Sequence, residues 1–387
     1  MYSKSVIFWS SCAGMLLFGI ALITLGSVVP DLRIKLQLDE ISSGALFSIL
    51  PFGVLAGSMV FGPVVDKYSY RILLSVSCVF MFAGFLGTAL ANSQGFLRIY
   101  AFLIGLGGGA VNGATNALVS DISDKDKGAN LSLLGVSFGI GALGMPLILG
   151  LLRDIASFET ILISVGILTL ATGMLFMLIR FPAPKQPHGF PVARSLGMLK
   201  DNVLILIAFF LFMQSSFEGI MNNWTTTYLI DYLSVRQSMA LYALSSFVAG
   251  MAFMRILIGT VLKSLTEMKL LFYSFIIILA GLIFLRTGNS IVPAIAGLVL
   301  LGAGLAAGFP VMLGVTGARY AELSGTAFSL VLFIALIGNM IVNYGMGVIA
   351  RNYGIQYLTI VGFAQLIIMI ILYIFIFGKN NKRKINT

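Results

Sequence analysis

Apolar stretches of about twenty residues recur from one end of this 387-residue sequence to the other. At a rise of 1.5 Å per residue, such a stretch is long enough for one α-helix to cross a hydrocarbon core of roughly 30 Å. Twelve of them are present, which predicts an all-α polytopic membrane protein. The predicted spans are 5–29, 41–65, 72–92, 98–120, 131–152, 159–180, 203–229, 239–262, 269–287, 291–316, 325–350 and 356–378.

The composition excludes a soluble protein, because only 10% of the residues are charged and soluble domains average about 25%. The first span lacks a small-residue cleavage site, so we expect it to stay as a helix rather than act as a signal peptide. Cys12 and Cys78 both lie inside spans, which favours neither a disulfide framework nor a metal site. No G-x-x-x-x-G-K-[ST] phosphate loop occurs. The sequence therefore predicts neither an ATP-driven pump nor an enzyme, and no cofactor or metal.

The net charge of +10 is explained by membrane topology. If both termini are cytoplasmic, sixteen Lys and Arg residues fall on the inner side and seven on the outer side, with Arg255 inside a span. Positive residues concentrate on the cytoplasmic side of membrane proteins. We therefore expect a multi-pass protein of the bacterial inner membrane with both termini inside. The basic C-terminal tail requires no nucleic acid, only anionic lipid headgroups.

One long polar interval, 181–202, divides the spans into two sets of six. It holds four of the ten prolines and the only histidine, His188, which we interpret as a solvated linker residue. The predicted organisation is an N-terminal six-helix bundle, 1–180, the cytoplasmic linker, 181–202, and a C-terminal six-helix bundle, 203–387. Two similar bundles are typical of transporters that bind substrate near the membrane midplane. We expect a monomer.

A short motif joins the second and third spans. The sequence "GPVVDKYSYR", 62–71, resembles the G-x-x-x-D-[RK]-x-G-x-[RK] loop of the major facilitator superfamily, with Gly62, Asp66, Lys67 and Arg71 in register. Ser69 replaces the second glycine of that pattern. Asp66, near the next helix, is suited to its free N–H groups and positive dipole end. The resemblance implies twelve helices in two pseudo-symmetric bundles and a conformational gating role for this loop.

The seventh span carries polar residues on one face. Gln214, Glu218, Asn222 and Thr225 are spaced by four, four and three residues, so they share one side of a helix. A charge at the centre of a spanning helix costs on the order of 2.5–3.5 kcal/mol. Either this stripe faces a water-filled cavity and binds a polar solute, or it forms a hydrogen-bonded cluster between helices. Glu218, the only carboxylate well inside a span, is predicted to be the proton-coupling residue.

Other polar and aromatic residues are candidates for substrate binding. Asn112 and Asn116 in the fourth span, and Asn339 and Asn343 in the eleventh, are each one helical turn apart. Each pair is suited equally to ligand contact and to interhelical bonding. Trp224 is suited to stacking on a substrate ring or to anchoring the helix at the interface. Glycines between 105 and 109 favour close helix packing.

Several segments resemble the fucose/glucose–proton symporter branch of the superfamily. In the seventh span, Glu218, Trp224, Tyr228 and Leu229 reproduce an E-x5-W-x3-Y-L pattern. Asn116 lies in "TNALV", which is similar to the corresponding segment of that branch, as are "GFPVMLGV", 308–315, and "GNMIVNYGMGVIA", 338–350. The resemblance implies a secondary active transporter that takes up a monosaccharide or related polar solute together with protons.

Two other functions agree with the sequence, an exporter and a channel or structural membrane protein. Phenylalanine-rich spans suit a proton-driven exporter of drugs or amphipathic metabolites. However, such exporters often carry an arginine in the fourth span at a position occupied here by Ala101. Na⁺ is an alternative coupling ion. A channel or structural membrane protein is a third interpretation.

Arg255 is a basic residue that lies inside a predicted span. It either extends its side chain to the cytoplasmic surface or reaches outward to Glu218.

Overall fold

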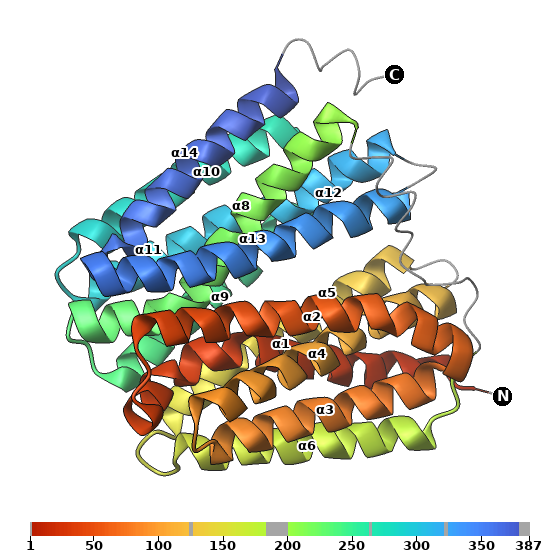
Figure 1. Cartoon of the computed structure of the whole chain (residues 1–387). Coiled ribbons are helices and arrows are strands. Elements are labelled where there is room, and N and C mark those ends of the chain that lie inside the picture. The colour runs from red at the N-terminus through yellow and green to blue at the C-terminus, as the bar shows by residue number, and fades with distance from the viewer. Residues whose placement is uncertain (1, 124–126, 183–199, 263–264, 321–323, 379–387) are drawn as a thin grey trace. The chain divides into compact units, whose positions relative to one another are not determined.

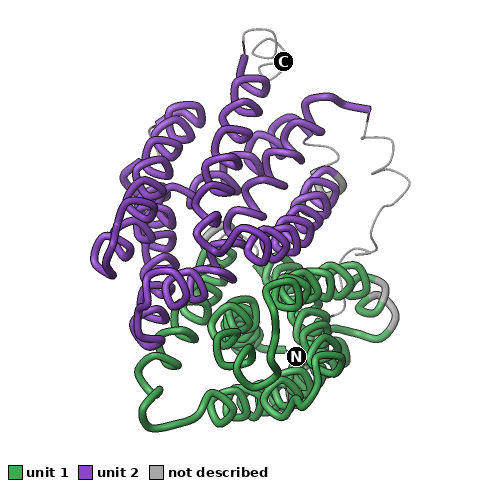
Figure 2. Tube along the Cα trace, turned by 60° about the vertical axis from the view of Figure 1, so that its left-hand side comes forward, with its two compact units in different colours: residues 1–190 green, residues 191–387 purple. Residues whose placement is uncertain are grey.

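The computed structural model describes residues 2–123, 127–182, 200–262, 265–320 and 324–378. The chain forms two compact units, Met1–Phe190 and Pro191–Thr387, shown in green and purple in Figure 2. Most of the predicted linker, including His188, lies outside the described residues, so the predicted domain limits remain a prediction.

The prediction of twelve membrane helices is confirmed for the described residues. The first unit holds six long helices that follow one another along the chain (Figure 1). Polar side chains begin several of them by accepting hydrogen bonds from the first backbone N–H groups, as Asp39 does from Ser42 at 2.8 Å. These helices are α1 Lys4–Leu36, α2 Glu40–Tyr68, α3 Tyr70–Leu90, α4 Gln94–Ile122, α5 Lys127–Leu151 and α6 Phe158–Leu178.

Glycines allow α2 and α4 to pack with their backbones in contact. A Cβ atom on Gly105 or Gly109 of α4 would collide with the carbonyl oxygens of Leu50 and Val54 on α2. Gly53 of α2 meets the backbone of α4 in the same way. Small residues at such positions are a common means of helix association in membranes, where apolar burial gives no driving force. The packing role predicted for the glycines between 105 and 109 is confirmed at Gly105 and Gly109.

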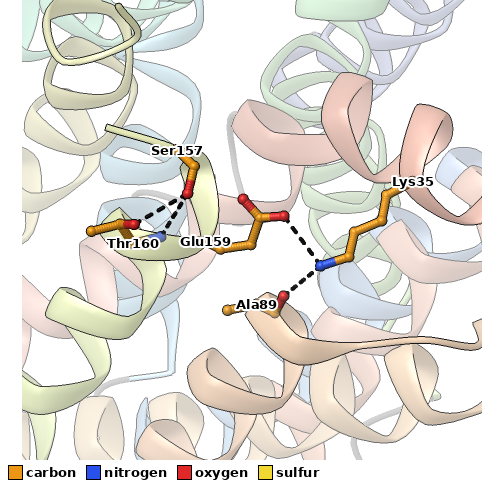
Figure 3. A network of polar contacts seen from close by, with 5 residues as sticks. All are labelled: Lys35, Ala89, Ser157, Glu159 and Thr160. Carbon is orange, nitrogen blue, oxygen red and sulfur yellow. Dashed lines mark hydrogen bonds and ion pairs between the residues drawn. The ribbon is translucent and has the colours of Figure 1, made fainter. Parts of the chain in front are cut away.

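Charged side chains join the helix ends of the first unit at the end where α1 meets α2. Lys35 of α1 donates hydrogen bonds to the Ala89 carbonyl at the end of α3, at 2.7 Å, and to Glu159 of α6, at 3.2 Å (Figure 3). Beside it, Arg153 after α5 pairs with Asp31 of α1 through two hydrogen bonds of 2.8 and 2.6 Å. The two ion pairs connect α1 with α6 and with the end of α5.

The motif between the second and third spans is more compact than the sequence suggests. Helix α2 continues to Tyr68 and α3 begins at Tyr70, so Ser69 alone forms the turn. Ser69 has φ 111° and ψ 157°, a conformation that only glycine adopts without strain. Asp66 is therefore in the last turn of α2 rather than in a loop. The side chains of Asp66 and Lys67 lie outside the described set, and the gating role remains a prediction.

The second unit contains the remaining spans. The seventh continues from α8 into the π-helical turn η1, and the tenth is divided into α11 and α12 (Figure 1). Helix α8 packs against α9, α12, α13 and α14, so it is central to this unit. The elements are α8 Asn202–Thr227, η1 Tyr228–Tyr232, α9 Gln237–Thr260, α10 Glu267–Thr287, α11 Ile291–Leu305, α12 Gly308–Arg319, α13 Ser324–Tyr353, η4 Ile355–Tyr357 and α14 Leu358–Phe377.

Candidate substrate and proton site

The predicted polar stripe lies on a single uninterrupted helix. Helix α8 runs from Asn202 to Thr227, so Gln214, Glu218, Asn222 and Thr225 share a face as their spacing predicts. The Gln214 Nε2 group donates a hydrogen bond of 2.8 Å to Glu218 Oε1. Gln214 is 1% exposed and Glu218 is half-buried. The carboxyl group is thus held by a neighbour one turn away.

A positive charge from a second helix acts on Glu218. Arg255 of α9 is the charged side chain whose field reaches the Glu218 carboxylate. Its own side chain is exposed, and no salt bridge joins the two residues in the described part of the unit. The choice between the two alternatives for Arg255 therefore stays a prediction: its side chain is exposed, as an interfacial role requires, and its charge is close enough to act on Glu218. The interaction acts at a longer range than an ion pair.

A neighbouring side of α8 is bonded to α13. Asn339 Nδ2 donates to the Ser215 carbonyl at 3.0 Å, and Asn343 accepts on Oδ1 from Asn223 Nδ2 at 3.0 Å. Gly219 makes this approach feasible, because a Cβ atom there would lie 2.6 Å from Asn339 Nδ2 and 2.7 Å from Asn343 Nδ2. Asn343 is fully buried. In this structure the two asparagines act as the interhelical alternative predicts.

Two other oxygens of the stripe accept no hydrogen bond from any described residue. Asn222 Oδ1 and Thr225 Oγ1 are buried and have no hydrogen-bond partner among the described residues. A buried oxygen of this kind costs free energy until a donor reaches it. A solute hydroxyl group is such a donor, so these two atoms are the best candidates in α8 for direct substrate contact.

The remaining predicted residues have different surroundings. In the first unit, Asn116 Nδ2 donates to Asn112 Oδ1 at 3.0 Å on α4, and Asn116 is exposed. Trp224 is fully buried, so no face of its indole ring is open to a ligand in this structure. Gly62 is buried in α2 and Arg71 is exposed at the start of α3. Within the described residues, no three His, Cys, Asp or Glu side chains are grouped as metal ligands.

Four polar residues of the second unit were not singled out from the sequence. Ser215, Ser216 and Asn223 are on the α13 and α14 side of α8, and Gln365 Nε2 of α14 donates to Ser216 Oγ at 2.7 Å. The sequence does contain a signal for Gln365, since it is the amide in the middle of the apolar run of the last span, whereas Gln356 lies at its start. Such a side chain in lipid requires a partner on another helix.

The twelve spanning helices and the polar face inside the seventh span define a multi-pass membrane transport protein. A family model of the Major Facilitator Superfamily matches residues 11–339, and the chain belongs to this family. The function is accordingly membrane transport of small molecules rather than enzymatic catalysis, and the resemblance of the motif at 62–71 is confirmed at the level of the superfamily.

Individual relatives are similar over nearly the whole chain. The glucose/mannose transporter GlcP of Bacillus subtilis (strain 168) is 25% identical over 343 residues, which cover 85% of this chain and 84% of that protein. The crystal structure of a D-xylose–proton symporter superimposes with a TM-score of 0.82 at 14% identity, covering 96% of this chain and 97% of the other. The nucleoside transporter NupG superimposes with a TM-score of 0.80 at 15% identity, over 97% of this chain and 100% of that one.

Proposed function

We propose that this protein takes up a monosaccharide together with protons by alternating access, and that Glu218 is the coupling group. The observation that carries the proposal is the polar face of α8. There a half-buried carboxylate is bonded to Gln214 at 2.8 Å, and the Asn222 and Thr225 oxygens that follow have no hydrogen-bond partner among the described residues. The protein acts as a monomer in a bacterial inner membrane, with both termini cytoplasmic and the membrane lipids as its surroundings.

A monosaccharide suits the chemistry of this face. A sugar ring presents several hydroxyl groups that donate and accept hydrogen bonds, and the buried Asn222 Oδ1 and Thr225 Oγ1 atoms are in need of donors. The similarity to a glucose/mannose transporter over most of the chain supports the same class of substrate. It favours sugar uptake over the export of amphipathic compounds.

Proton coupling follows from the cost of moving charge through the membrane. A carboxylate that closes away from water with its substrate is far less costly when it is protonated. Glu218 binds a proton while the site is open to the outside and releases it when the site opens to the cytoplasm. The proposed substrate contacts are Gln214, Asn222, Asn112 and Asn116. Trp224, Asn339 and Asn343, which are buried or bonded between helices in this structure, would join them in another conformation of the transport cycle. The proposed gating segment contains Gly62, Asp66, Lys67 and Arg71.

Transport by purified protein in proteoliposomes tests this function. With an inward proton gradient, radiolabelled glucose, mannose or xylose should accumulate, and an uncoupler should abolish the accumulation. A sodium gradient in place of the proton gradient should be ineffective.

The Glu218→Gln variant imitates a permanently protonated carboxyl group. It should lose uphill accumulation yet keep the exchange of labelled for unlabelled sugar across the membrane. Glu267→Gln is the matched control, since it makes the same change at the start of α10, and it should transport normally. Accumulation at the wild-type level in Glu218→Gln would reduce this residue to a structural one, and failure of every sugar would refute the substrate class.

A further inference from the structure

The tenth span is interrupted next to the polar face of α8. Pro310 has no backbone N–H, so it cannot donate to the carbonyl of Ala306 four residues earlier. Helix α11 ends at Leu305 and the half-helix α12 begins at Gly308. The last carbonyl groups of an ending helix lack intrahelical donors. The break therefore exposes backbone acceptors that another element must satisfy.

Gln214 provides a donor at this break. Its Nε2 group donates to the Leu305 carbonyl at 2.7 Å and also to Glu218 Oε1 at 2.8 Å. A primary amide has two N–H bonds, so both are in use, one for each partner. A Cβ atom on Gly308 would collide with the Oε1 atom of Gln214, and only a glycine at this position admits the amide. One side chain thus joins Glu218 to both sides of the break.

We propose that Gln214 is a positioning residue that transmits the proton occupancy of Glu218 to the break in the tenth span, so that α12 moves when Glu218 gains or loses its proton. This inference rests on the proposed function, in that Glu218 exchanges a proton during transport. It adds a specific connection between the proton and a moving element.

The protonation state of Glu218 determines which way the Gln214 amide is oriented. A carboxylate only accepts hydrogen bonds, and it holds Gln214 Nε2 toward both Glu218 and Leu305. Bonds to a charged acceptor are roughly twice as strong as bonds to a neutral one. Once Glu218 is protonated, its new O–H donates best to the Gln214 oxygen, which requires the amide to turn over. The amide oxygen then faces the Leu305 carbonyl, where two acceptors oppose each other, and the break loses its donor.

Charged groups from several elements surround α8 and α12. Arg255 of α9 acts on Glu218, while α13 and α14 contribute the uncharged amides Asn339, Asn343 and Gln365 to the surface of α8. At the far end of α12, Arg319 lies 3.7 Å from Asp201. Glu267 of α10 is opposite Gly314, at a distance of 3.8 Å from a Cβ atom built there.

The groups at the far end of α12 keep their charge state near neutral pH. Burial alone would raise the pKa of Asp201, but hydrogen bonds from the Tyr320 hydroxyl and from the Leu204 and Val203 N–H groups, with the nearby Arg319 charge, lower it overall. Burial, with the hydrogen bond to Asp201, raises the pKa of Tyr320 to about 12. These residues therefore do not titrate in the range where the test is made.

Distances between two nitroxide labels within the second unit test the inference. One label is attached at Ala318→Cys on α12 and the other at Ile276→Cys on α10, both exposed positions, in a protein whose native Cys12 and Cys78 are replaced by serine. The distance distribution is recorded in proteoliposomes between about pH 5 and about pH 9, a range in which carboxyl groups buried in proteins can gain or lose a proton. In the parent protein it should change with pH, and Glu218→Gln should abolish that change.

Two variants interrupt the contact between Gln214 and the break in the tenth span, one by changing Gln214 and the other by changing the break. Gln214→Met preserves the side-chain length without hydrogen bonds, and Gly308→Ala displaces the amide without changing any polar group. In both, the distance should no longer respond to pH, although Glu218 is intact. Gly314→Ala is the matched control in the same half-helix, where the new methyl group meets only Glu267 at an ordinary contact distance, and its response should equal that of the parent.

The outcomes separate this inference from the proposed function. A pH response that persists in Gln214→Met and Gly308→Ala, or that is absent from the parent, overturns the inference even if Glu218→Gln loses accumulation in the transport assay. Wild-type accumulation by Glu218→Gln refutes the function itself. Size-exclusion profiles identify any variant that fails to fold. If either Gln214→Met or Gly308→Ala fails to fold, the pH response of the other variant tests the inference.

Discussion

At the scale of single residues, the polar side chains of α8 separate into two groups by what they contact. Asn223 and the Ser215 carbonyl are bonded to α13, whereas Asn222 and Thr225 carry buried oxygens without a described partner. Adjacent asparagines thus have different surroundings, because successive residues of a helix point about 100° apart. Asn223 stabilises the unit, and Asn222 is available to a ligand.

Exchanging each asparagine for alanine should separate stability from binding. Asn343→Ala removes the acceptor of Asn223 and should lower the free energy of unfolding by about 0.6–2 kcal/mol, the range for hydrogen bonds between membrane helices. Asn222→Ala removes a buried oxygen that has no described partner, so it should not lower the stability of the sugar-free protein, and it should weaken sugar binding by about tenfold, equivalent to one lost hydrogen bond. Thermal unfolding in detergent and binding of labelled sugar measure the two effects. A reversed pattern would exchange the roles assigned to these residues.

At the scale of elements, the backbone between α2 and α3 is strained at a single residue. The turn between α2 and α3 consists of Ser69 alone, at φ 111°. The superfamily pattern has a glycine at this position, and the backbone here has the conformation that glycine adopts without cost. Serine is accommodated only because the helices on both sides fix the chain.

Replacing Ser69 by glycine should relieve this strain. Non-glycine residues in this region of φ and ψ cost of order 1–3 kcal/mol, so Ser69→Gly should raise the free energy of unfolding by about 1 kcal/mol. Ser48→Gly, within helix α2, is the matched control and should be destabilising by roughly 0.5–1 kcal/mol. Thermal unfolding in detergent compares the two. A loss of stability in Ser69→Gly would show that the serine side chain itself is required.

The start of α8 and the end of α12 are joined by a charged group that titrates in acid. Asp201 accepts a hydrogen bond from the Val203 N–H at 2.8 Å, which satisfies the first turn of α8. Because the pKa of Asp201 is lower in the folded protein than in the unfolded chain, its carboxylate contributes stability at neutral pH. That contribution is complete above the ordinary pKa of about 3.9 and is lost as the pH falls through the lowered value.

Asp201→Ala should therefore reduce the free energy of unfolding by about 1 kcal/mol at pH 7. The difference from the wild type should stay constant down to about pH 5 and shrink below about pH 4, where the carboxyl group of the unfolded chain begins to take up its proton. Unfolding by denaturant at several pH values provides the measurement. Asp154→Ala, at an exposed loop position, should show no such difference, and a pH-independent loss in Asp201→Ala would exclude a role for the charge.

At the scale of the whole molecule, the sequence determines most of the architecture because lipid imposes a simple length rule. Every described span was found from its apolar run, and Gln214, Glu218, Asn222 and Thr225 share a face as spacing alone predicts. The break at Leu305 was not predicted, since proline is tolerated within membrane helices and Pro310 gives no warning of where α11 ends. The hydrogen-bond partners of Asn339 and Asn343 could not be predicted either, because residue spacing defines a helix face but not the helix that packs against it.

The predicted topology is tested by labelling from each side of the membrane. Single cysteines at Ser69 and at His188 should react with an impermeant thiol reagent in inside-out vesicles and remain unreactive in intact cells. A cysteine at Asp154 should show the reverse pattern, since it is in a loop of the opposite side. Reaction of Ser69→Cys or His188→Cys in intact cells would contradict the cytoplasmic location of both loops and termini.

The ion pair between Lys35 and Glu159 has a consequence for biogenesis. The two residues are 124 positions apart, and at a synthesis rate of about 5–20 residues per second the lysine precedes its partner by roughly 6–25 s. During that interval the end of α1 has no Glu159 to pair with. The bond closes only when α6 has been inserted, so it distinguishes a completed first unit from every shorter nascent chain.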